Sequence, residues 1–218
     1  MAAMMTGAGI AEGLAVHTLS KEYSPRHGNE RLMIEIQALP FQPCWVLMPH
    51  HTGEMGRPAD VMAEMRRRGV RAAKLYPTAH QYRLSEWCAG ELLSALEESG
   101  MPVLLDSDQA NWEEIGLCLH AHPDLRLVLQ RTSYRCDRYL YPLFEEFEHL
   151  RLETGGYQVT GGIEAIANRF GARRLVFGTG MPVFNPGAAI AQVTYADLPS
   201  EDKQLIAGEN LRRLLDHG

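Results

Sequence analysis

The sequence predicts an α/β protein in which short parallel strands alternate with helices. Three observations indicate this class: seven short apolar runs recur along the chain, a helical run follows each of them, and no Pro-, Gly- or Ser-rich linker divides the series. The 218 residues, 45% of them hydrophobic and 22% charged, suffice for one sizeable core. We therefore expect a single domain over residues 1–218.

The expected strands share a short, apolar, Leu-rich or β-branched composition, which is typical of a parallel sheet buried on both faces. They cover residues 14–17, 44–48, 70–75, 103–106, 125–129, 150–153 and 175–178. The expected helices cover a segment around 32–36, then 59–68, 85–99, 111–120, 139–147 and 163–170, and closing helices end at 210–215. Residues 20–29 are expected to form a polar loop, and Gly69 and Gly100 to end their helices.

These units fit either an open doubly wound sheet or a closed barrel. A (β/α)8 barrel typically takes ~250 residues and eight units, so this chain is short by one unit. An open sheet often carries a Gly-rich phosphate-binding turn, and no GxGxxG or GxxxxGK[ST] sequence follows any strand. The pattern alone leaves both architectures open.

The composition argues against several classes of partner. A net charge of -6 disfavours a broad surface for nucleic acid or anionic membranes, and no apolar run approaches the ~20 residues of a membrane span. The first charge is Glu12, so the basic start of a secretory signal is absent, and the four cysteines form no CxxC pair. We expect a cytoplasmic protein with reduced thiols and a small-molecule substrate, without nucleic-acid or membrane partners.

Four segments carry a resemblance to a known family. They are GVRAAKLYP at 69–77, HPDLRLVLQ at 122–130, RRLVFGTGMP at 173–182 and IAGENLRRLL at 206–215. In this order they resemble the fourth strand, the entry to the sixth strand, the eighth strand and the C-terminal helix of amidohydrolase-related, metal-dependent hydrolases. That resemblance implies a TIM-type (β/α) barrel. Because residues 14–17 resemble the second strand, we expect the first strand-helix unit to be lacking, and a homodimer is one way to cover the exposed strand edges.

The resemblance also implies where a metal would bind. The family's ligands are a His pair on the first strand, His residues ending strands five and six, and an Asp after strand eight. The matching positions here hold Asp106, Gln130 and Gly180, and a catalytic metal needs about three protein ligands. We expect no metal cofactor. The alternative is a rebuilt site for a divalent metal such as zinc, held by His17, His50, His51 and Asp106.

The candidate catalytic residues are Asp106, Lys74 and Glu153, because polar groups at the C-terminal ends of barrel strands meet at one mouth. Lys74 is either a cation for an acidic substrate or, as we favour, the ion-pair partner of Asp106. Glu153 is either a pocket acid or the partner of Arg131, and Asp108 is favoured as a helix cap. The candidate substrate-binding residues are His17, His50, Arg131, Tyr134 and Thr179.

Three functions stay open at this point. The first is a hydrolase of a small organic amide, lactone or carboxylate with a degenerate metal site, which is then inactive or uses Asp106, Lys74 and Glu153 as acid–base groups. The second is a hydrolase or decarboxylase with the rebuilt metal site. The third is a non-enzymatic small-molecule binding or scaffolding protein.

Overall fold

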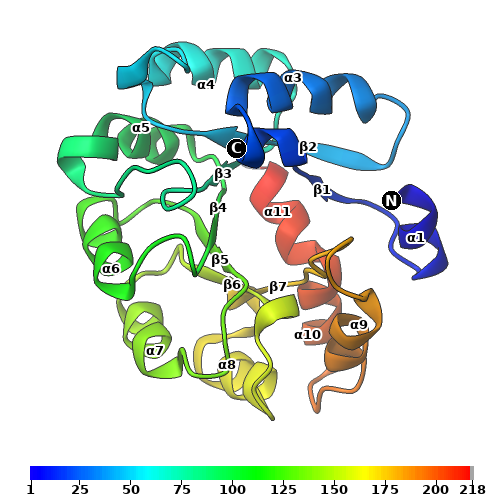
Figure 1. Cartoon of the computed structure of the whole chain (residues 1–218). Coiled ribbons are helices and arrows are strands. Elements are labelled where there is room, and N and C mark those ends of the chain that lie inside the picture. Colours follow the sequence, from blue (N-terminus) through cyan, green and yellow to red (C-terminus); the bar gives the residue numbers. More distant parts are fainter. Residues whose placement is uncertain (217–218) are drawn as a thin grey trace.

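The computed structural model describes residues 1–216, and its centre is a curled sheet of seven parallel strands (Figure 1). Each strand pairs with its neighbour in the sequence, in the order β1 to β7. The strands are β1 (Gly13–Ala15), β2 (Phe41–Leu47), β3 (Ala72–Leu75), β4 (Val103–Asp106), β5 (Leu127–Gln130), β6 (Arg151–Glu153) and β7 (Leu175–Val176). This confirms the α/β class and the TIM-type barrel that lacks part of the eight-unit ring.

Helices cover the outside of the strands, as Figure 1 shows for α4 to α8. They are α1 (Ala2–Gly7), α2 (Thr18–Glu22), α3 (Pro25–Glu35), α4 (Pro58–Arg67), α5 (Glu86–Ser99), α6 (Trp112–Ala121), α7 (Asp137–Glu146), α8 (Gly162–Phe170), α9 (Pro186–Thr194), α10 (Ser200–Gln204) and α11 (Asn210–Asp216). Short helical turns η1 (His50–Thr52), η2 (Thr154–Gly156), η3 (Ala172–Arg174) and η4 (Leu205–Glu209) join them.

Alternation along the strands separates two apolar clusters. Ala73, Leu105 and Leu129 belong to the large core between the strands and the outer helices. Ala72, Leu104 and Val128 belong instead to a small cluster inside the ring, together with Cys44 and Leu215. Successive side chains of a strand point to opposite faces, so the residue two positions beyond each inner residue also points inward. Those residues are Lys74, Asp106 and Gln130, at or next to the C-terminal ends of the strands.

The last helix, α11, fills the interior where the ring is incomplete. Leu211, Leu214 and Leu215 of α11 pack against the inner cluster, and Figure 1 shows this helix, in red, passing between β7 and β1. An ion pair of 2.9 Å joins Arg212 of α11 to Glu12, directly before β1. The apolar face of a helix therefore occupies space that a further strand would line in a complete barrel.

A buried side chain extends the hydrogen bonding of β2 beyond the short β1. β1 pairs only with the first residues of β2, with Ala15 opposite Pro43. Farther along, Asn29 of α3 donates from Nδ2 to the carbonyl of Val46 and accepts from the Val46 N–H, both at 2.9 Å. The amide thus satisfies one edge of β2 as a strand would. Ser20 Oγ donates to the Asn29 oxygen at 3.2 Å and holds its orientation.

Two local predictions were wrong. Residues 20–29 are mostly helical, because Ser24 accepts from the His27 N–H as the N-cap of α3 and Pro25 follows at its first position. The cap of α6 is Asn111, which accepts from the Glu114 N–H at 2.8 Å, whereas Asp108 accepts from the Gln109 side chain. The helix ends were predicted better: Gly69 and Gly100 both adopt positive φ, at 70° and 64°.

The four cysteines are free thiols, and burial raises the pKa of Cys44 to about 12. Within residues 1–216, no helix combines the length and apolar character needed to cross a bilayer.

The Asn29→Ala substitution should lower the free energy of unfolding by about 2–4 kcal/mol, because it leaves the buried N–H and carbonyl of Val46 without partners. Urea denaturation measures the loss. The matched control on the same helix is Arg31→Ala, which removes only an exposed pair with Glu35 and should cost less than about 0.5 kcal/mol. Equal losses in the two variants would contradict this role for Asn29.

Candidate active site

A buried lysine lies between two acceptors at the mouth of the barrel. The Lys74 Nζ is 2.7 Å from Asp106 Oδ1 and 2.7 Å from Gln130 Oε1. The Lys74 side chain is 10% exposed and that of Asp106 6%. The favoured Lys74–Asp106 ion pair is therefore present, and it joins the ends of β3, β4 and β5. An ammonium group has three N–H donors, so one is left over from these two acceptors.

Glu153, at the end of β6, lies in a nearly closed setting. Burial raises the pKa of its carboxyl, while hydrogen bonds from the Gly155 and Arg131 backbones and the charge of Lys74 act in the opposite direction. Oε1 accepts from the Gly155 N–H at 2.9 Å. The carboxyl lies against Gly178, where an added Cβ would come within 1.9 Å of Oε1. A carboxyl of raised pKa holds its proton closer to neutral pH, so Glu153 is suited to donate one.

Positive charges surround the Tyr76 ring, which follows Lys74 by two residues on the same face. The Lys74 Nζ lies 5.2 Å from its centroid and the Lys21 Nζ of α2 lies 5.3 Å from it. Burial, and secondarily the Asp106 charge, raise the pKa of Tyr76, so its hydroxyl stays protonated and can donate. Arg131 stacks over Phe184 at 5.4 Å and has a φ of 53°, an uncommon value for a residue with a side chain. The mouth is thus rich in donors for a negatively charged group.

The charged and hydroxyl-bearing side chains of the mouth line one cavity of ≈ 1170 Å³. It includes Lys74, Asp106 and Glu153, and also Tyr76 and Gln130. Of the candidate substrate-binding residues, His17, Arg131 and Thr179 line it. His17 also caps α2 by accepting from the Leu19 N–H, and its Nε2 lies 3.3 Å from Glu35.

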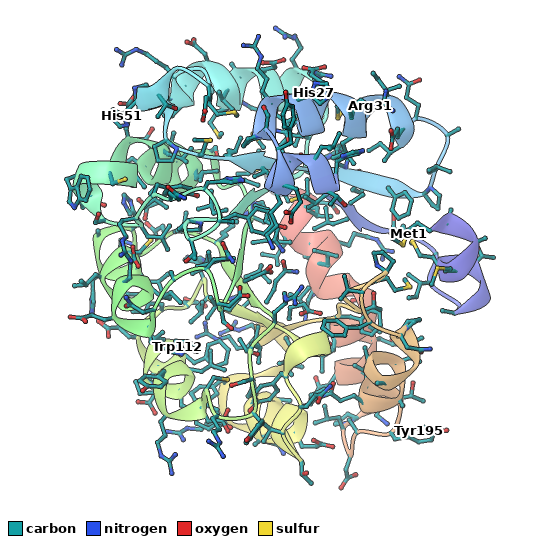
Figure 2. All side chains as sticks on the ribbon, viewed as in Figure 1. Met1, His27, Arg31, His51, Trp112 and Tyr195 are labelled. Atoms are coloured by element: carbon teal, nitrogen blue, oxygen red, sulfur yellow. The ribbon has the colours of Figure 1, made fainter. Side chains whose placement is uncertain are left out.

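Two candidate residues lie away from this cavity. After β2 the chain turns at Pro49 into η1, where the His50 ring stacks on His51 and its Nε2 is 3.7 Å from Glu91 on the outer helix α5. Figure 2 shows His51 at the periphery. Tyr134 is 59% exposed and stacks with Arg135. Neither His50 nor Tyr134 is among the residues that line the cavity.

The side chains at the mouth do not form a set of ligands that fits a divalent metal ion. Within residues 1–216, no three His, Cys, Asp or Glu side chains are placed to hold one ion together. Asp106 is already paired with an ammonium, Gln130 offers only an amide oxygen, and Gly180 has no side chain. The four residues of the rebuilt site are also separated, because His50 and His51 lie outside the cavity that holds His17 and Asp106. The Lys74 ammonium is the cation that these oxygens bind.

Comparison with known proteins identifies the family. A family model described as Amidohydrolase matches residues 46–216, from β2 to the end of α11. This is most of the chain, and it includes every candidate catalytic residue. The protein belongs to this amidohydrolase family. A comparison with curated proteins found no match.

Solved structures share the fold at low sequence identity. An uncharacterised TIM-barrel protein from Bordetella bronchiseptica is 22% identical, with a TM-score of 0.79 over 99% of this chain and 81% of that one. A 2,6-dihydroxybenzoate decarboxylase from Rhizobium is 17% identical, with a TM-score of 0.69 over 98% and 86%. A 5-carboxyvanillate decarboxylase from Novosphingobium aromaticivorans, solved with manganese and a nitrobenzoic acid, is 13% identical, with a TM-score of 0.73 over 98% and 78%. At these identities the likeness shows the fold alone.

Sequence reasoning placed Gln130 at a strand end without giving it a role, and it missed Tyr76 and Lys21 at the mouth. Tyr76 and Gln130 were detectable, because they continue the inward-facing positions of β3 and β5 after Ala72, Lys74 and Val128. Lys21 was not, since it comes from the segment expected to be a loop and reaches the mouth only through α2.

The Glu153→Gln variant should change how stability depends on pH. Because the folded-state pKa of Glu153 is raised, the folded protein binds more protons than the unfolded chain above the unfolded value of ~4.3, and stability falls as pH rises through that window. Glutamine removes this loss. In urea titrations at pH 4, 5.5, 7 and 8, the variant should gain stability relative to the parent as pH increases.

The exposed Glu113→Gln variant on α6 controls for the removal of one carboxyl. A stability difference for Glu153→Gln that is constant from pH 4 to pH 8 would contradict the raised pKa.

Proposed function

We propose that this protein is a metal-independent hydrolase of the amidohydrolase family that cleaves an ester, lactone or amide of an organic acid. The observation that carries the proposal is the Lys74 ammonium, held at 2.7 Å by both Asp106 and Gln130 inside the cavity. A fixed, buried cation is suited to stabilise the negative charge that develops on a carbonyl oxygen during hydrolysis.

Each group then has a distinct task. The third N–H of Lys74 donates to the substrate carbonyl oxygen. Asp106 accepts a proton from a water molecule, whose oxygen attacks the carbonyl carbon. Glu153 donates its proton to the oxygen or nitrogen of the leaving group as the bond to carbon breaks. Two carboxyl groups in different environments, one ion-paired and one desolvated, suit this division between base and acid.

Donors at the mouth support a substrate with a negative charge. Lys21, Arg131 and the Tyr76 hydroxyl line the same cavity as Lys74, and Arg presents a planar pair of donors to a carboxylate. Two structural neighbours are named as decarboxylases of aromatic acids, whose substrates carry such a group. Decarboxylation at this mouth is the second reaction to assay, with Glu153 supplying the proton that replaces carbon dioxide.

The decisive variant is Lys74→Met, which should lower kcat/KM by at least about 100-fold because the donor to the developing oxyanion is lost. The assay uses a panel of esters, lactones and amides of organic acids, in the presence of a chelator. Lys203→Met is the matched control, because Lys203 lies outside the cavity lining and donates to the Thr194 carbonyl at the surface. Circular dichroism checks that Lys74→Met is folded, and Gln130→Leu offers a milder variant that removes one Lys74 partner without a charge change.

Three results would contradict the proposal. They are activity that a chelator abolishes and zinc restores, full activity in both the Lys74 and Gln130 variants, or no turnover in the panel although carboxylates stabilise the fold. The last result would assign the protein to non-catalytic binding of small molecules.

A further inference from the structure

The cavity continues far beyond the catalytic groups. Its ≈ 1170 Å³ exceeds the 300–1,000 Å³ typical of pockets for drug-sized ligands. From Lys74 and Glu153 it runs to the gap between β1 and β7, and Met1, labelled in Figure 2, is part of its lining. A ligand no larger than a simple carboxylic acid would leave most of this space unused.

The lining changes character along the cavity. Apolar side chains from four elements around the gap between β1 and β7 line another part of the cavity, and we call this part the side groove. Its residues are Leu14 of β1, Ile36 after α3, Ile190 and Val193 of α9, and Leu211 of α11. The mouth holds the positive charges of Lys21, Lys74 and Arg131, whereas Arg212 and Glu12 beside the groove form an ion pair with each other.

We propose that the substrate is amphipathic: an organic acid derivative whose carboxylate or carbonyl meets the cations at the mouth and whose apolar chain or ring lies in the side groove. This inference rests on the proposed function and specifies its substrate class. Continuity of the groove with the charged mouth favours one molecule that spans both over a protein partner, because a protein surface on the groove would not reach Lys74.

The length of the ligand's hydrocarbon chain is the variable that tests this arrangement. Butanoate, octanoate and dodecanoate, each below its micelle concentration, are titrated calorimetrically into the protein at neutral pH. Burial of a methylene group is worth about a fourfold change in affinity when it is complete. We expect the Kd to fall by at least about tenfold from butanoate to octanoate.

Two variants test whether the effect of hydrocarbon length on affinity arises in the side groove. Ile190→Trp fills the groove from a position outside the two buried clusters, so the fold should persist. It should weaken octanoate binding by about tenfold and leave butanoate binding unchanged. Ala188→Trp, exposed on the same helix and absent from the cavity lining, is the control and should change neither.

The outcomes separate this inference from the proposed function. Binding of all three acids with equal affinity would overturn the side groove as a chain site and leave the charged mouth in place. Binding of none of them would also overturn the inference, while the proposed function is judged by the activity assay of the Lys74 and Gln130 variants. Light scattering that shows a dimer dissociated by Ile190→Trp would assign the groove to a second copy of the chain and would also overturn the inference.

Discussion

The ion pair between Lys74 and Asp106 determines what the mouth of this barrel can do. Three neighbouring strands end at one group, because the ammonium contacts Asp106 of β4 and Gln130 of β5 at the same distance. A buried charge without such partners would cost several kcal/mol, so each strand end needs the other two. The same contact keeps a positive charge fixed in the cavity where we propose that the substrate binds. The stability of the strand ends and the proposed chemistry thus depend on one side chain.

The incomplete ring explains the unusual role of the last helix. In a closed barrel, layers of inward side chains from the strands fill the interior. Here the inner residues Ala72 and Cys44 are small, and the leucines of α11 supply the missing volume. Asn29 performs a related task along β2, where its amide replaces the backbone of a neighbouring strand. The leucines of α11 and the Asn29 amide therefore take the place of strands that are short or absent within residues 1–216.

The order and type of the elements could be predicted from the sequence, because seven apolar runs and their following helices are local signals. The resemblance of 69–77 and 173–182 then decided between the open sheet and the barrel, which composition could not. Lys74 and Asp106 were predictable as neighbours from strand alternation. The position of His50 was not, because Pro49 turns the chain away from the mouth after β2. Lys21 depends on the packing of α2, and the inward position of α11 depends on contacts distant in sequence.

The wall of the barrel is held by different interactions where a helix takes the place of strands. Strands exchange backbone hydrogen bonds with their neighbours, so separating two of them leaves peptide groups unpaired. A helix satisfies most of its own peptide groups. Where α11 lies between β7 and β1, Asn210 of α11 donates to the carbonyl of Leu175 in β7 at 2.8 Å. On the β1 side, Arg212 forms an exposed ion pair with Glu12. On the β1 side, the wall is therefore held by the packing of leucine side chains and one exposed ion pair, whereas backbone hydrogen bonds between strands hold the wall that carries Lys74.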